Sequence, residues 1–383
     1  MKHNSQVNRI TAVTEVFPDG RRCVAAVLEY AKEPLHANLE DYLVEGRQIT
    51  DVKKEGAVVT ISLSPDDEAA KLYVPGEPWE NVPARLIPAK IMVQQVKDLM
   101  ARDGSLIPAA KPDENDRERN LLEEEFVTGS FEGLAYNLFI PRNYDPSVQY
   151  PLVQFIHDAA VCGPQTGLTL AQGHGALSFM TPEAQSAHAC FVLAPQYDMP
   201  AIVDDDWNVD HRLEVGRRLL DQIVSQYSID PNRLYTTGES MGCMSSMVLN
   251  LRNPDYFAAS YFVAGQWDER AFRGAELSDK HFWFICSQGD AKAFPGMNQI
   301  LCVLEREGAK IAREVWRADW SGDVYSEKAK ALIDTGANII YTPYEITSVA
   351  NGWHSDGGEH HVNTWRTAYD IEAVRDWLFA QHK

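Results

Sequence analysis

The sequence lacks the features that mark several classes of binding protein. Its 383 residues include 35 Lys and Arg against 55 Asp and Glu, which gives a formal charge of −20. A negative field of this size repels phosphate backbones and anionic lipid headgroups. We therefore expect neither nucleic acid nor a membrane as a partner, and look for a small molecule.

Long hydrophobic runs are also missing. No apolar stretch approaches the roughly 18 residues that a membrane-spanning helix needs. The opening Met-Lys-His-Asn-Ser-Gln leads into no apolar segment of the signal-peptide type. The sequence as it stands is typical of a cytoplasmic protein, or of a secreted one from which a leader has been removed.

Cysteine is scarce and scattered. The six cysteines, at positions 23, 162, 190, 243, 286 and 302, form no CxxC pair. They are too sparse for a disulfide scaffold, and no Cys/His cluster has the spacing of zinc ligands. We expect buried free thiols, no metal and no organic cofactor.

The composition is that of an ordinary globular protein, with 45% hydrophobic and 23% charged residues, and the length suggests two domains. The first hundred residues read as short strands separated by turn signals, at residues 10–16, 22–30, 57–63, 72–75 and 89–96. This spacing favours a small all-β sandwich. Residues 110–118 are polar and read as a linker, so we place the boundary near residue 115, between domains 1–115 and 116–383.

The second domain alternates predicted strands with predicted helices. The strands are expected at residues 133–140, 152–156, 190–193, 233–237, 261–264, 282–286 and 339–344, and the helices at 213–227, 242–251, 297–307 and 370–381. Several of the strands are continuous apolar runs, as strands buried on both faces should be. The alternation predicts an α/β domain in which helices cover both faces of a mostly parallel sheet.

Gly238-Glu239-Ser240-Met241-Gly242 has the G-x-S-x-G pattern of a nucleophile elbow. It lies between a predicted strand and a predicted helix, the context that gives this short pattern its meaning. A sharp turn there would present the Ser240 hydroxyl above the sheet, and the flanking glycines would allow the close approach of neighbouring backbone. Ser240 is therefore the candidate nucleophile.

A serine nucleophile needs a base, and the base needs a carboxylate to orient it. Asp290 follows the predicted strand 282–286, at the end of the strand where such sheets bind ligands. Three histidines come after the last predicted strand, at His354, His360 and His361. The residues alone leave the choice among these three open.

Two N–H donors should bind the oxyanion. The first is expected from Met241, directly after the nucleophile. The second is expected from the loop after residues 152–156, where Ala159 is the first choice and Ala160 the alternative. His157 of this loop is predicted to support the loop and not to act as the base.

Several stretches resemble bacterial α/β-hydrolase esterases related to polyhydroxybutyrate depolymerases and feruloyl esterases. The resemblance covers nearly all of residues 125–383. Its main segments are Asn137-Leu138-Phe139-Ile140-Pro141, Ile229-Asp230-Pro231-Asn232-Arg233-Leu234-Tyr235, the elbow, and Thr364-Trp365-Arg366-Thr367-Ala368-Tyr369. The N-terminal part more weakly resembles the immunoglobulin-like domain that some of these esterases carry, most of all at Val44-Glu45-Gly46-Arg47-Gln48-Ile49.

The resemblance implies an α/β-hydrolase fold preceded by an immunoglobulin-like sandwich. It also implies that the base is the histidine shortly before Trp365, which selects His361. His361 precedes that tryptophan by four residues where three is commoner in the group, so His360 remains a rival. Two further departures are His157-Asp158, where the group usually has His-Gly, and Cys243, where glycine is common and where we expect packing beneath the elbow.

The sequence thus predicts a serine carboxylesterase with Ser240, Asp290 and His361 as its triad, acting on small or aromatic, feruloyl- or acetyl-type esters. Trp207 and Trp267 are candidate substrate contacts, and loops 158–180 and 198–211 are expected to set specificity. The acidic run at residues 204–206 is read as solvated and not as a metal site.

Three alternative functions stay open. A serine peptidase on the same scaffold would release an amine in place of an alcohol, and a non-catalytic binding protein would keep only the fold. The N-terminal domain could bind carbohydrate, shape the entrance of the cleft or mediate self-association into a homo-oligomer.

Overall fold

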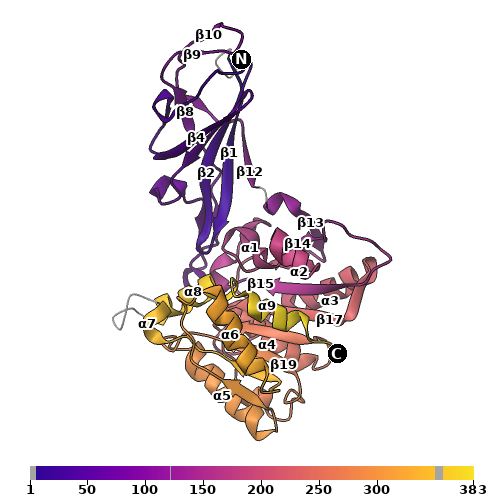
Figure 1. The fold of residues 1–383 in the computed structure, drawn as a ribbon. Helices are drawn as coiled ribbons and strands as arrows, with labels where there is room; N and C mark the ends of the chain where they lie inside the picture. The colour runs from indigo at the N-terminus through magenta and orange to yellow at the C-terminus, as the bar shows by residue number, and fades with distance from the viewer. Residues whose placement is uncertain (1–5, 121, 350–356) are drawn as a thin grey trace. The chain divides into compact units, whose positions relative to one another are not determined.

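The computed structural model describes residues 6–120, 122–349 and 357–383, and the chain folds into two compact units. The smaller unit contains residues 1–74 and 85–125, and the larger contains residues 75–84 and 126–383 (Figure 1). The boundary predicted near residue 115 thus lies ten residues before the division in the structure. The predicted linker is in part strand β12 (Arg117–Asn120), which pairs in parallel with β1 (Val7–Phe17).

The smaller unit consists of β-sheets around their own apolar core. Its main sheet has the order β12-β1-β2-β5-β4, where β2 is Gly20–Tyr30, β4 is Ile49–Glu55 and β5 is Val58–Leu63. A second sheet has the order β11-β8-β3, with β11 at Asp113–Glu114, β8 at Met92–Gln95 and β3 at Tyr42–Val44. Alternate residues such as Ile10, Leu28 and Ile61 are buried in the core. The predicted sandwich is confirmed.

The larger unit has a nine-stranded sheet of order β13-β14-β16-β15-β17-β18-β19-β21-β20. The strands are β13 (Phe126–Phe131), β14 (Leu134–Phe139), β15 (Tyr150–Ile156), β16 (Phe191–Gln196), β17 (Ile229–Glu239), β18 (Ala259–Val263), β19 (His281–Ile285), β20 (Ile311–Arg313) and β21 (Ile339–Tyr341). The β13–β14 and β14–β16 pairs are antiparallel and the other pairs are parallel. Every residue of β15, β16 and β18 is buried, as their apolar runs predict.

Helices cover both faces of this sheet (Figure 1). On one face α3 (Arg212–Gln226), α4 (Met241–Arg252) and α5 (Ala293–Arg306) contribute Leu219, Met247 and Ile300 to the core. On the other face, Trp283 of β19 packs against Trp377 of α9 (Glu372–Phe379), with ring centroids 5.3 Å apart. The predicted α/β class, with helices on both faces of a mostly parallel sheet and a small all-β sandwich earlier in the sequence, is confirmed.

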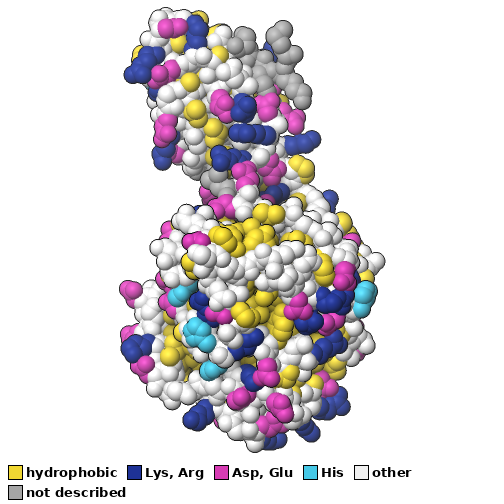
Figure 2. All heavy atoms as spheres, turned by 90° about the vertical axis from the view of Figure 1, so that its right-hand side faces the viewer, with side chains coloured by type: hydrophobic (Ala, Val, Ile, Leu, Met, Phe, Trp, Pro, Cys, Tyr) yellow, Lys and Arg dark blue, Asp and Glu magenta, His cyan; other side chains and the backbone are white. Residues whose placement is uncertain are grey.

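Five of the six cysteines are buried and Cys302 is exposed, and all six are free thiols. In the described parts of the chain, no helix is long and apolar enough to cross a membrane. On the face of the larger unit shown in Figure 2, acidic and basic side chains are interspersed. The excess negative charge is therefore mixed with positive charge on that face.

Candidate active site

Ser240 lies in a strained turn between β17 and α4. Its φ of 52° and ψ of −117° are rare for a residue with a side chain. A Cβ at Gly242 would lie 1.8 Å from the Ile156 carbonyl oxygen, and one at Gly238 would lie 2.4 Å from the same atom. The neighbouring strand therefore requires glycine at both positions, as the elbow pattern predicts.

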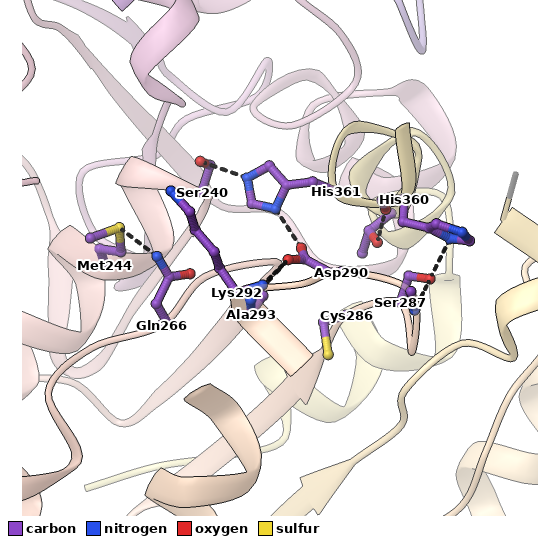
Figure 3. Close-up of polar contacts among 12 residues, drawn as sticks. Ser240, Met244, Gln266, Cys286, Ser287, Asp290, Lys292, Ala293, His360 and His361 are labelled. Carbon is purple, nitrogen blue, oxygen red and sulfur yellow. Dashed lines mark hydrogen bonds and ion pairs between the residues drawn. The ribbon is translucent and has the colours of Figure 1, made fainter. Parts of the chain in front are cut away.

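The structure brings Ser240, His361 and Asp290 together in one hydrogen-bonded row (Figure 3). The Ser240 hydroxyl lies 2.8 Å from Nε2 of His361, and Nδ1 of His361 lies 2.5 Å from Oδ2 of Asp290. Since the carboxylate can only accept, Nδ1 carries the proton and Nε2 is left to accept from the serine. This is the arrangement needed to take a proton from Ser240.

Asp290 is held as an anion by its surroundings. Burial raises the pKa of its carboxyl, but the hydrogen bond and charge of His361 and the N–H groups of Ala293 and Lys292 outweigh burial and lower the pKa below its ordinary value. Those two N–H groups reach Oδ1 at 2.8 and 3.0 Å. They belong to the start of α5, where the helix dipole also favours negative charge.

His360, the rival base, has another task. It is 2% exposed, and its Nδ1 lies 2.9 Å from the Ser287 hydroxyl, on the loop that carries Asp290. His360 and His361 both lie on α8 (Gly357–Ala368), where adjacent side chains point about 100° apart. Of these two histidines, only His361 faces Ser240. The third candidate, His354, lies outside the described residues.

His157 supports the loop after β15. The residue is fully buried, and burial lowers the pKa of its imidazole to about 4. Its Nε2 accepts the N–H of Tyr197 at 2.9 Å, so its Nδ1 donates to the Asp158 carbonyl at 2.8 Å. A neutral imidazole with both nitrogens engaged fits the predicted structural role and not that of a base.

The geometry favours Ala159 as an oxyanion donor over Ala160. The Ala160 N–H already donates to Oδ1 of Asp158 at 2.5 Å. Ala159 begins the short turn η5 (Ala159–Val161), and Met241 begins α4, so neither N–H has a partner within its own helix. Both expected donors, Met241 and Ala159, therefore remain candidates.

A segment distant in sequence also holds this loop. Residues 75–84 are part of the larger unit. The Gly76 N–H donates to the Ala160 carbonyl at 2.6 Å, and the Ala84 N–H donates to the Cys162 carbonyl at 2.9 Å. The sequence has no motif here, and its strand pattern assigns these residues to the first domain.

Two buried carboxyls accompany the nucleophile. Burial raises the pKa of Asp158 to about 6, although the Ala160 N–H and His361 act to lower it. Burial also raises the pKa of Glu239 well above its usual range, and nearby Asp158 raises it further. Glu239 is the variable residue after the first glycine of the elbow, and Asp158 replaces a common glycine. The sequence alone predicts a raised pKa for neither carboxyl.

The two candidate substrate contacts pair with each other. Trp207 and Trp267 lie with ring centroids 5.3 Å apart, Trp267 is 7% exposed and Trp207 is half-buried. Cys243 is buried beneath the elbow, where a Cβ at Gly265 would lie 2.7 Å from its sulfur. This is the packing position expected for that cysteine.

The acidic run beside Trp207 is exposed, as its sequence predicts, and two of its carboxylates also make defined contacts. Asp204 accepts the N–H groups of Asp206 and Asn208 at 3.0 and 2.9 Å. Asp205 forms an ion pair with Lys292, with Oδ2 and Nζ 2.5 Å apart. The carboxylates of Asp204 and Asp205 therefore serve different partners. Asp205 also contacts Gln266. The sequence alone assigns no role to Lys292 or Gln266, because an isolated polar residue forms no recognisable motif.

Comparisons with known proteins agree with this architecture. Residues 9–108 match the family model of the esterase Ig-like N-terminal domain, which confirms the immunoglobulin-like part of the resemblance. A crystal structure of a thermostable esterase matches with a TM-score of 0.81 and 24% identity, and the match covers 98% of this chain and 100% of that chain. The two chains therefore share one fold over both domains.

More distant similarities involve other esterases. Acetylxylan esterase A of Emericella nidulans is 27% identical over an alignment 92 residues long, and the match covers 20% of this chain. This chain thus spans only 30% of that curated relative. A ferulic acid esterase structure matches with a TM-score of 0.43 and 12% identity, over 67% of this chain and 98% of its own.

Proposed function

We propose that this chain, whose N-terminal domain matches the esterase Ig-like family, is a carboxylic ester hydrolase that uses Ser240 as its nucleophile. The observation that carries the proposal is the row from Ser240 through His361 to Asp290, with contacts of 2.8 and 2.5 Å. A serine in a strained elbow, next to an imidazole oriented by a buried carboxylate, is an arrangement that activates a hydroxyl.

In the first half of the proposed reaction, Ser240 Oγ attacks the ester carbonyl while Nε2 of His361 takes its proton. The carbonyl oxygen becomes an oxyanion that accepts hydrogen bonds from the Met241 and Ala159 N–H groups. Asp290 keeps Nδ1 protonated and stabilises the imidazolium. Nε2 then gives the proton to the leaving alcohol as the C–O bond breaks, which leaves an acyl group on Ser240.

In the second half, a water molecule takes the place of the alcohol. Nε2 of His361 accepts one proton of the water as its oxygen attacks the acyl carbonyl. The same proton returns to Oγ when the intermediate collapses, so the acid leaves and the enzyme is restored. These steps use the side chains of the triad and the backbone N–H groups.

The proposed substrates are small or aromatic esters of the feruloyl or acetyl type. Support comes from the paired rings of Trp207 and Trp267 and from the esterase names among the relatives, including an acetylxylan esterase. A peptidase on the same triad is the alternative. Matched ester and amide substrates separate the two functions, because an esterase should cleave only the ester at a useful rate.

The test is hydrolysis of p-nitrophenyl acetate by the full chain and by the variants Ser240→Ala and His361→Ala. A folded wild type that hydrolyses the ester, with both variants reduced at least about a thousandfold, supports the proposal. A folded wild type that hydrolyses no ester in an acyl series from acetate to decanoate, and no feruloyl ester, contradicts it and favours a binding protein with a hydrolase fold.

A further inference from the structure

The loop after β16 reaches across the sheet. We name residues 198–211 the strap. In the sheet order, β15 and β17 lie between β16 and β18, and β19 lies beyond β18. Asp205 of the strap nevertheless contacts Gln266, which follows β18, and Lys292, which follows β19. With strands about 4.8 Å apart, the strap spans roughly 15–20 Å.

The strands that the strap must pass carry the reactive groups. The carboxyl end of β15 leads into the oxyanion loop, and the carboxyl end of β17 leads into Ser240. Parallel strands bring all of these loops to the same edge of the sheet. The strap therefore passes the edge where an ester must approach Ser240.

The base and middle of the strap are firmly held by hydrogen bonds. The Arg212 guanidinium donates to the carbonyls of Asp198 and Pro200 at 2.6 and 2.7 Å. The Asp210 N–H donates to the Ile202 carbonyl at 2.8 Å, and Asp204 caps the turn that follows it. Trp207 occupies this turn with a φ of 65°, a strained conformation that the surrounding contacts must impose.

Asp205 fastens the tip of the strap to the catalytic loops. Its Oδ1 accepts the Gln266 amide at 2.8 Å, and Gln266 is 8% exposed and lies 3.9 Å from the Met244 sulfur in the first turn after Ser240. The Oδ2 atom of Asp205 accepts a hydrogen bond from the Lys292 ammonium. The backbone N–H of Lys292 donates in turn to Asp290. Figure 3 shows Lys292 extending from the Asp290 loop toward the Ser240 side of the site.

Two further features place a ligand surface beside this fastening. The Gln266 Oε1 atom is buried and has no hydrogen-bond partner among the described residues. The Trp79 ring is 81% exposed and lies 5.5 Å from the Lys292 ammonium, within the larger unit. An exposed indole and an unused buried acceptor beside this fastening are features expected of a substrate wall.

We propose that the strap is a roof that limits the size of the ester group reaching Ser240, and that Asp205, Lys292 and Gln266 fasten it. This inference rests on the proposed esterase function. It makes Asp205 and Lys292 specificity-determining residues, although neither touches the reacting atoms. Releasing the fastening lets the strap move outward, so the enzyme discriminates less against large ester groups.

The kinetic test compares Asp205→Ala and Lys292→Met with the matched control Asp206→Asn, which changes an exposed neighbouring acid. For p-nitrophenyl decanoate relative to acetate, the ratio of kcat/KM should rise about tenfold in the first two variants and stay constant in the control. The double variant should rise no further than either single variant, because both changes release one fastening. If this ratio stays constant or falls in Asp205→Ala and Lys292→Met, the proposal that the strap limits the size of the ester group is wrong.

A second measurement keeps this inference separate from the esterase proposal. Hydrogen exchange of residues 198–211 should be faster in Asp205→Ala than in Asp206→Asn, because the strap opens more often when its tip is free. Equal exchange in the two variants overturns the fastening, whether or not the chain hydrolyses esters. If the wild type hydrolyses none of the esters, the esterase proposal is wrong, and the proposal that the strap limits ester size is wrong with it. Faster exchange of residues 198–211 in Asp205→Ala than in Asp206→Asn would still establish that Asp205 fastens the strap.

Discussion

The imidazole of His360 packs directly against Gly289: a Cβ added at Gly289 would lie 2.4 Å from Cδ2 of that ring. Gly289 precedes Asp290, and Ser287 of the same loop contacts Nδ1 of His360 at 2.9 Å. The histidine next to the candidate base therefore holds the loop of the candidate acid. In the proposed reaction, positioning of the acid loop and proton transfer therefore fall to adjacent residues of one helix.

Gly289→Ala should distort the loop that carries Asp290, although it replaces no residue of the triad. The new methyl group would force the buried His360 ring to shift, and overpacking of this kind costs about 1–3 kcal/mol of stability. Urea unfolding should show a loss of this size, and kcat for p-nitrophenyl acetate should fall as Asp290 moves. Stability and kcat both equal to wild type would show that the contact is not tight.

The two histidines should separate cleanly on substitution. His361→Ala should reduce kcat about 10³–10⁴-fold, because it removes the imidazole that lies 2.8 Å from the Ser240 hydroxyl. His360→Ala should instead cost about 1–3 kcal/mol in urea unfolding, since it leaves the buried Ser287 hydroxyl without this partner. An inactive but fully stable His360→Ala, beside an active His361→Ala, would assign the base to His360.

Asp290→Asn should change both kcat and the dependence of stability on pH. An amide that donates to Nδ1 favours the wrong imidazole tautomer, so kcat should fall about 10³–10⁴-fold. The pKa of Asp290 is lowered, so its ionised form contributes stability above the ordinary carboxyl pKa. That contribution is lost as the pH falls through the lowered pKa. The free energy of unfolding of wild type should therefore exceed that of Asp290→Asn by more at pH 7 than at pH 3.

Asp158→Asn should have the opposite pH dependence. The pKa of Asp158 is raised to about 6, so the folded state favours its protonated form and loses stability as the pH rises toward and past this value. A rise of about two pKa units corresponds to on the order of 2–3 kcal/mol. Asparagine keeps an acceptor for the Ala160 N–H and carries no charge.

Urea unfolding of Asp158→Asn and wild type at pH 4 and pH 8 checks this. The variant should gain stability relative to wild type on going from pH 4 to pH 8. The exposed Asp206→Asn serves as the control and should show no such gain. A difference between Asp158→Asn and wild type that is the same at both pH values would contradict the burial of an ionisable Asp158.

The elbow and the acid loop could be predicted because their signals are local. A glycine–serine–glycine turn between a strand and a helix defines Ser240, and the end of a buried strand defines Asp290. The buried strands could be located from continuous apolar runs alone. The confirmed fold class follows from the same alternation.

Other features depend on contacts that no local pattern encodes. Adjacent His360 and His361 look equivalent until α8 turns them toward different neighbours, and the glycines at its start suggest a loop instead. The polar strand β12 reads as a linker because its side chains are mostly exposed, while its backbone pairs with β1. The Asp205–Lys292 contact joins residues 87 positions apart, so only the folded sheet brings them together.

The acyl group expected on Ser240 gives the decisive experiment. The wild-type chain mixed with p-nitrophenyl acetate and quenched within milliseconds should gain one acetyl group by mass spectrometry. Peptide mapping should place that group on Ser240, and Ser240→Ala should gain none. Turnover of the ester by the wild type with no acetyl group on Ser240, or with equal turnover by Ser240→Ala, would contradict catalysis through this serine.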